Sequence, residues 1–459
     1  MSAAFLFFAG MLEYWQDISR RKDKMERHVM KRKRLHRTNR IKGIAGCILL
    51  AAGFALLFIS RLSQEFAHWY STKVYPVWVG TTGRLMNLFP FSVSEVFLYI
   101  MIVIILLSAG VLIIKEVRRK AGKKEACSWG MGLFLLAAFL FFLYVLNCGV
   151  NYQRESFSES SGLQVENYTA GDLKEVCQWL TLKVNETSSE VERDQDGVMV
   201  LDIPMEKYAA EAMRGLGEDY PELAGYYPRP KGLLVPWILS IQNLTGVYSP
   251  FTVEANYNSG MIDYNIPFTA CHELSHLRGF MQEEEANFIA YLACSRSDNV
   301  QFRYSGNLLR WIYCMSVLHT VDYDAWEEVR QTLAPEVEPD LAANREYWAR
   351  YDGAVAEVSN KVNDTYLKAN GQDDGVKSYD RMVDLIVAYY LKVIIRRQEF
   401  ATMQSIGLMV GGVATDVRFS LKQITRKSGI GMMRRRNGDV SCQSEIRRRG
   451  SGRKRKIRI

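Results

Sequence analysis

The sequence predicts an α+β protein in which an N-terminal bundle of three transmembrane helices precedes a mixed α/β domain. Three apolar runs without charged residues lie in the first third of the 459-residue chain, at about residues 43–60, 96–114 and 130–150. Each run is long enough to cross a bilayer as a helix. The region that follows mixes strand-like pieces at 197–203 and 233–241 with longer helical ones. Both kinds of element therefore belong to one folded domain after the spans.

Basic residues around the apolar runs predict the orientation in the membrane. Residues 1–42 carry 12 Lys+Arg against 4 Asp+Glu, and the 115–124 loop carries six Lys+Arg. The 61–95 loop carries only three. Positive residues remain cytoplasmic. The alternative, buried helices of a soluble protein, does not account for these flanking clusters. We therefore expect a multi-pass protein of the cell membrane with a cytoplasmic N-terminal segment, residues 1–42, and an extracytoplasmic domain.

Charge separates the domain from the C-terminal tail. Residues 151–417 hold 22 Lys+Arg against 40 Asp+Glu, whereas residues 418–459 hold 15 against 2. We divide the chain into spans at 43–153, a domain at 154–400 and a basic, disordered tail at 401–459. Such a tail can bind anionic lipid or nucleic acid, but no nucleic acid is expected outside a membrane. The eight cysteines form no Cys-x-x-Cys pair, so they predict neither a structural zinc site nor a disulfide framework.

The segment Cys271–His276 contains His-Glu-x-x-His, the zinc-hydrolase signature. Pro267 suits a helix start and Gly279 a helix end, so the motif should occupy a short helix. His272 and His276 then lie on one helical face, where their imidazoles can share one metal ion. Glu273 flanks that ion as a general base. Cys271 points about 100° away from His272 around the helix, which favours buried packing over ligation.

A second predicted helix at 283–291 offers a third ligand. Its start, Glu283-x-x-Ala-Asn287, resembles the Glu-x-x-Ala-Asp/Asn motif of gluzincin metallopeptidases, in which the glutamate completes a His2Glu site. The resemblance places the ligand at Glu283. Asn287 lies one turn further on the same face and could orient a ligand histidine. The alternatives are a solvated helix start, with no ligand among the three glutamates, or His319 as the ligand.

Further motifs along the chain resemble one family. They are Asn151-Tyr152-x-Arg154-x-Ser156-Phe157, Pro250-Phe251-Thr252-x-Glu254-Ala255-Asn256, Pro267-Phe268-Thr269-x-Cys271-His272-Glu273, Glu283-x-Glu285-Ala286-Asn287 and Ser378-Tyr379-Asp380-Arg381-x-Val383-Asp384-Leu385. From about residue 43 to about 395 the chain resembles the uncharacterised bacterial membrane family called domain of unknown function 3810. The resemblance implies a zinc-peptidase-like membrane protein with a zincin-like domain. More distantly, the site resembles membrane-anchored gluzincins such as the sensor peptidases of β-lactam signalling and the CAAX-processing class.

The resulting hypothesis is a membrane-anchored zinc metallopeptidase, a protease that hydrolyses a peptide or protein substrate. His272, His276 and Glu283 would hold one Zn²⁺ per chain, and Glu273 would take a proton from the attacking water. The alternative is a non-catalytic zinc-binding sensor or scaffold in the membrane. Glu273 favours catalysis because a purely structural site needs no base.

An oxyanion donor and a substrate strand are also expected. Tyr379 and Arg381, from the C-terminal motif, and Tyr257 are the candidate donors. Residues 248–258 precede the motif helix, where zincins place an edge strand that binds the peptide backbone. A structured loop over the site is the alternative for this segment.

Overall fold

The computed structural model describes residues 2–118, 122–163, 165, 167–372 and 379–395. The chain divides into two compact units, residues 1–386 and 387–459. Within the described residues the protein is mostly helical and has one three-stranded sheet, which agrees with the α+β class. The predicted tail, residues 401–459, lies outside the described residues.

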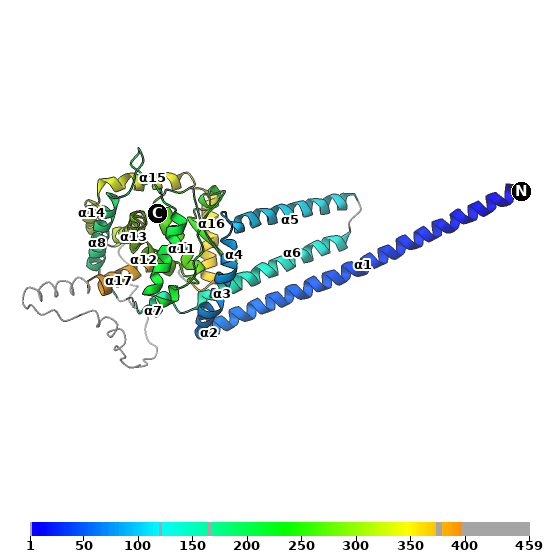
Figure 1. Ribbon diagram of the computed structural model, residues 1–459, viewed down its shortest axis with the longest axis horizontal. Coiled ribbons are helices and arrows are strands. Elements are labelled where there is room, and N and C mark those ends of the chain that lie inside the picture. Colours follow the sequence, from blue (N-terminus) through cyan, green and yellow to red (C-terminus); the bar gives the residue numbers. More distant parts are fainter. Residues whose placement is uncertain (1, 119–121, 164, 166, 373–378, 396–459) are drawn as a thin grey trace, which may run out of the picture. The chain divides into compact units, whose positions relative to one another are not determined.

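Three helices are long and apolar enough to cross a membrane, and this supports association with a bilayer (Figure 1). They are Lys33–Leu62 within α1 (Ser2–Leu62), α5 (Val93–Val117) and Lys123–Gln153, which begins as α6 (Lys123–Tyr144). The three predicted spans lie within these ranges. The predicted N-terminal segment continues the first span as one helix, because no proline or glycine between Met11 and Lys42 interrupts it.

The connection between the first two spans folds into short helices. These are α2 (Gln64–Trp69), α3 (Tyr75–Trp78) and α4 (Arg84–Met86), joined by π-helical turns at Tyr70–Val74 and Val79–Gly83. The side-chain hydroxyl of Ser63 accepts from the Phe66 N–H and so caps α2.

The domain beyond the spans is built from helices around a small sheet. The helices are α7 (Phe157–Ser160), α8 (Ala170–Ser188), α9 (Met205–Gly215), α10 (Trp237–Ser240), α11 (Asn265–Leu277), α12 (Glu283–Ser295), α13 (Val300–Val321), α14 (Tyr323–Arg330), α15 (Glu338–Ala349), α16 (Ala354–Ala369) and α17 (Tyr379–Tyr389). All thirteen residues of α11 are buried, and α12 and α13 pack beside it (Figure 1). The core of the domain therefore surrounds the predicted motif helix.

The sheet has the order β1-β3-β2, with β1 (Lys231–Gly232) parallel and β2 (Gly246–Ser249) antiparallel to β3 (Glu254–Tyr257). Two sequence expectations are corrected. Residues 197–203 contribute only a bridge between Arg193 and Met199, because Gly197 turns the chain at φ 78°. Within 233–241, Pro236 precedes a helix, α10, rather than a strand.

The segment 248–258 is neither one edge strand nor a loop. It contains the end of β2, a turn and the central strand β3, so the edge strand of this hairpin is β2, which begins at Gly246. Both strands pack against α11. The predicted alternatives for this segment therefore each describe part of a β-hairpin.

Contacts of the second span cross the predicted division at residue 153. Glu95, in the first turn of α5, accepts from the backbone N–H groups of Leu234 and Val235 at 2.8 and 2.9 Å. Glu254 on β3 accepts from the N–H groups of Val93 and Ser94 at 3.1 and 2.8 Å. A carboxylate at a helix N-terminus satisfies N–H groups that have no partner inside the helix. These buried contacts join the 61–95 connection to the domain.

Candidate metal centre

Two helices and a tight turn form the candidate site. Pro267 lies in the first turn of α11, and Gly279 follows the helix with φ 97°, a left-handed conformation that glycine adopts without strain. The Phe280 N–H returns to the Ser275 carbonyl at 3.1 Å and closes the turn. The chain then enters α12 at Glu283. The sequence prediction of these two helices is confirmed.

Three side chains converge between the helices. The Nε2 atoms of His272 and His276 lie 3.0 Å apart. One carboxylate oxygen of Glu283 lies 3.3 Å from His272 Nε2, and the other lies 3.5 Å from His276 Nε2. In tetrahedral zinc sites with bonds of about 2.0–2.2 Å, neighbouring ligand atoms lie about 3.3–3.5 Å apart. The two histidine–carboxylate distances match this spacing and the distance between the Nε2 atoms is slightly shorter, so the three residues fit one zinc ion after a small adjustment of the rings.

The outer ring nitrogen of each histidine has a hydrogen-bond partner. His272 Nδ1 lies 3.0 Å from Asn287 Oδ1, and His276 Nδ1 lies 2.8 Å from the carbonyl oxygen of Phe280. Both partners are acceptors to which a ring Nδ1–H can donate, and this contact turns each Nε2 atom toward the Glu283 carboxylate. This is the outer arrangement that accompanies metal-ligating histidines.

The pKa values of the protein groups agree with a site for positive charge. Burial lowers the pKa of His276, but the Glu283 carboxylate outweighs burial and raises this pKa to about 9. Burial raises the pKa of Glu283, but His276 and His272 hold it well below its usual range. The carboxylate therefore remains ionised and available as a ligand.

Glu273, the predicted general base, lies outside the group of three converging side chains. It is buried, and its Oε2 has no hydrogen-bond partner among the described residues. Burial raises its pKa to about 7, against the lowering effect of the two histidines. A hydrogen bond from the backbone N–H of Tyr248 on β2 helps to place it. A carboxylate with a pKa near neutrality is suited to accept and return a proton.

Sequence reasoning missed Gly246, the first residue of β2. A Cβ atom there would lie 2.6 Å from Glu273 Oε1 and 2.8 Å from Thr269 Cγ2. The strand approaches the motif helix this closely only because residue 246 has no side chain. A lone glycine before a short strand gave no sequence signal for this contact.

For the zinc hydrolase that the sequence predicts, substituting Gly246 by alanine is expected to displace Glu273 and to lower the rate of hydrolysis by about tenfold or more, while zinc remains bound. Metal analysis and a peptidase assay on the same preparation would measure both. Gly215→Ala is the matched control, because a Cβ there meets nothing within 4 Å. Full activity of the Gly246→Ala variant would show that the close approach is not needed.

Asn287 tests the outer arrangement separately. Asn287→Ala removes the acceptor of the His272 Nδ1 proton and is expected to weaken zinc binding about 10–100-fold. Asn287→Asp keeps an acceptor oxygen and should preserve the affinity. Competition against a zinc chelator measures both variants. Equal affinity of Asn287→Ala and the wild type would remove Asn287 from the site.

Fully buried Arg310 on α13 contacts α12, the helix that carries Asn287. Its guanidinium donates to the Asn287 carbonyl oxygen at 2.7 Å. The rings of Phe268, Tyr291 and Tyr313 lie 5.3–5.9 Å from it. Burial lowers the pKa of Arg310 to about 10, so it still carries its charge at neutral pH. This cation fixes the backbone of α12 where Asn287 meets His272.

The predicted oxyanion donors have other partners. The Tyr257 hydroxyl donates to Glu206 at 3.0 Å, and Arg381 pairs with Glu284 at 3.3 Å. The side chain of Tyr379 lies outside the described residues. Half-buried Tyr313, on α13, was not predicted. Burial is the main cause of its raised pKa, while the charge of Arg310 lowers this pKa and the charge of Glu283 raises it. The charge of Glu283 also acts on Tyr152, so this interaction does not single out one tyrosine.

His319 does not join the ligand set in the described structure. Its ring stacks edge-on against Tyr323 and Trp326, with centroids 5.3 and 4.8 Å away. These contacts account for the histidine by packing at the end of α13.

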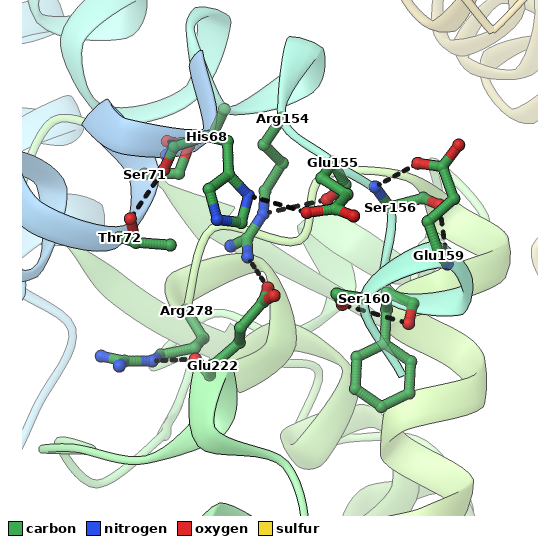
Figure 2. A network of polar contacts seen from close by, with 12 residues as sticks. His68, Ser71, Thr72, Arg154, Glu155, Ser156, Glu159, Ser160, Glu222 and Arg278 are labelled. Atoms are coloured by element: carbon green, nitrogen blue, oxygen red, sulfur yellow. Dashed lines mark hydrogen bonds and ion pairs between the residues drawn. The ribbon is translucent and has the colours of Figure 1, made fainter. Parts of the chain in front are cut away.

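A second group of metal-ligating side chains, His68, Glu155 and Glu222, lies beside a cavity of about 830 Å³. Figure 2 shows the Arg154 guanidinium among them, directed at Glu222. Arg154 also lies over the Phe280 ring, 3.9 Å from its centroid. A buried guanidinium already supplies the positive charge that a metal would bring. The group therefore supports the turn after α11 and is not carried further as a metal site.

Comparison with known proteins gives a family but no activity. The family described as protein of unknown function (DUF3810) matches residues 70–387. No curated protein and no solved structure matches the chain. The match begins at Tyr70, in the connection between the first two spans, and includes both helices of the candidate site.

Proposed function

The chain belongs to the DUF3810 family of unknown function, and we propose that it is a membrane-anchored zinc metallopeptidase of gluzincin type with a zincin-like domain. The observation that carries the proposal is the convergence of His272 Nε2, His276 Nε2 and the Glu283 carboxylate at 3.0–3.5 Å. Three protein ligands leave a fourth position open, which distinguishes catalytic from structural zinc sites.

Each residue has one task in the proposed reaction. His272, His276 and Glu283 would hold zinc, which when bound acts as a Lewis acid toward the scissile carbonyl. Glu273 takes a proton from the attacking water and returns it to the leaving amine. Its buried, partly unpaired carboxylate suits this shuttle. Tyr379 remains a proposed oxyanion donor and Tyr313 joins it, while Tyr257 and Arg381 have other partners in the structure.

The edge of β2 is the proposed binding line for the substrate backbone. The Tyr257 carbonyl accepts from the Leu233 N–H beside β1 at 3.1 Å, and the Asn258 N–H donates to the Thr245 carbonyl at 2.7 Å. In an antiparallel pair the bonded positions alternate. The backbone groups of Gly246 and Tyr248 therefore face away from β3, on the side of Glu273. An extended peptide could add to this edge.

A zinc-binding sensor or scaffold is the second candidate. The contacts between the spans and the domain favour it, because they could carry a signal. Glu273 favours the peptidase over the sensor, because a structural zinc site needs no general base beside the ion.

Two measurements on the full-length protein in detergent test the proposal. Zinc analysis should find about one ion per chain, and an unfolded protein should be hydrolysed until a chelator is added. A fragment starting at residue 154 is unsuitable, because it lacks Glu95 and the helices of the 61–95 connection. Zinc without hydrolysis of any substrate would favour the sensor.

Orientation is a separate proposal, with the N-terminus cytoplasmic and the domain outside the cell. Moving the basic 115–124 loop across the bilayer would be costly. A reporter that is active only outside the cell should work when fused after Lys392 and fail when fused at Gly122. The reverse result would place the site in the cytoplasm and make intracellular proteins its substrates.

A further inference from the structure

We infer that this site acts on polypeptide segments just where they leave the bilayer, so that its substrates are the juxtamembrane segments of membrane-anchored proteins. This inference rests on the proposed peptidase function and names its substrate class. It follows from where the edge strand β2 begins and where it ends.

One end of β2 lies beside Glu273, the proposed general base. Gly246 approaches Glu273 so closely that a Cβ would meet its carboxylate. The N–H of Tyr248, two residues further, bonds the same carboxylate. A peptide added to this edge would therefore pass directly over the base.

The other end of β2 lies against the spans. Pro250, directly after the strand, accepts through its carbonyl from Asn147 Nδ2 at 2.8 Å. The Tyr248 hydroxyl donates to the Asn147 carbonyl at 3.2 Å. Asn147 belongs to the last turns of the third candidate span. Across the hairpin, Glu254 bonds the first N–H groups of α5, the second span. The hairpin turn thus touches the ends of two spans.

The metal turn touches the same boundary. Cys148 Sγ, in the third span, lies 3.6 Å from Met281 Sδ, between α11 and α12. The hydroxyl of Tyr75, from the short helices before α5, donates to the Leu277 carbonyl at 2.9 Å and lies 2.7 Å from the Tyr248 hydroxyl. Both helices of the site are thus held by residues at or beside the spans.

Exposed apolar side chains surround this contact. They belong to the segment before α5, to the segment after β1 or to the hairpin. They are Leu85, Leu88, Phe89, Leu234, Trp237, Val247 and Phe251, each 41–76% exposed. A surface of this kind, continuous with apolar spans, suits the interfacial layer of a bilayer. It keeps the hairpin turn at the membrane surface.

The length of β2 sets the distance between Glu273 and the membrane-facing end of the strand. From Gly246 to Ser249 the chain advances three residues, about 10 Å at 3.3 Å per residue. Glu273 meets β2 at Gly246 and at Tyr248, so a substrate paired with β2 would present its scissile bond about one to three residues from the membrane-facing end of the strand. A soluble substrate would have to bring its backbone to the bilayer surface.

A spacer series tests this in vesicles of phosphatidylcholine and phosphatidylglycerol that contain the full-length protein. Each test substrate is one transmembrane helix, a Gly/Ser spacer, a randomised segment and a folded reporter. A short spacer has about three residues, and a long one about 30 residues, with a reach of roughly 30 Å. Both are tethered equally, so their surface concentrations match. The same randomised segment without the helix is the soluble control.

We expect the short-spacer substrate to be cleaved about tenfold or more faster than the long-spacer one, at a fixed distance from its helix. Glu273→Gln should abolish this cleavage. Equal rates for short-spacer, long-spacer and soluble substrates would overturn the inference and leave the peptidase function intact. Absence of cleavage in all three, with zinc bound, would overturn both.

Discussion

Replacing Glu273 by glutamine is expected to lower hydrolysis about 10²–10⁴-fold while the protein keeps about one zinc ion per chain. The carboxylate is buried beside the ligands but contacts none of them as a hydrogen-bond or ion-pair partner in the described structure. Glutamine keeps the shape and loses the basic oxygen. Initial rates and metal content, measured on one preparation, give both results.

The matched control for this change is Glu284→Gln. Glu284 is buried and ionisable like Glu273, but it faces Arg381 and the Gln372 amide, at 3.3 and 2.7 Å. Its replacement should leave the rate per folded molecule unchanged. A Glu273→Gln protein with wild-type rates would exclude this glutamate as the base.

Removing a ligand is expected to remove the metal. His276→Ala deletes one of the two converging nitrogens, and Glu283→Gln replaces the anionic ligand by a neutral amide. Both should reduce bound zinc from about one per chain to background after dialysis, and hydrolysis should disappear with it. Inductively coupled plasma analysis of the purified variants measures the metal directly.

The position of the acidic ligand is tested by the neighbouring glutamates. Glu285 accepts from the Phe157 N–H at 2.6 Å and so supports a turn rather than an ion. Glu285→Gln should therefore retain zinc. Loss of zinc in Glu285→Gln or Glu284→Gln, with retention in Glu283→Gln, would place the ligand one or two residues later in α12.

The local part of the site could be predicted from the sequence because helix geometry fixes it. The four-residue spacing of His272 and His276 defines their shared face, and the α12 motif places Glu283 after a short turn. The three spans follow from length and lack of charge alone. Asn287 could be assigned for the same reason, since it lies one turn from Glu283.

The remainder depends on contacts between distant segments, which leave no periodic signal. Gly246 matters only because β2 packs against α11. Tyr75 matters only because it bonds Leu277, although the second and third spans separate the two residues in the sequence. The 61–95 connection was predicted as a loop, although Glu95 joins it to residues 234–235. The prediction of strands at 197–203 and 233–241 was wrong because Gly197 forms a turn and Pro236 precedes a helix.

Zinc X-ray absorption spectroscopy of the purified full-length protein tests the central claim most directly, because it identifies the ligand atoms. The account predicts two imidazole nitrogens at about 2.0–2.1 Å and carboxylate oxygen at about 2.0–2.2 Å, with no sulfur. His272, His276 and Glu283 supply these atoms, while Cys271 lies buried and free beside them. A spectrum with sulfur at about 2.3 Å, or a protein that binds no zinc, would contradict the account.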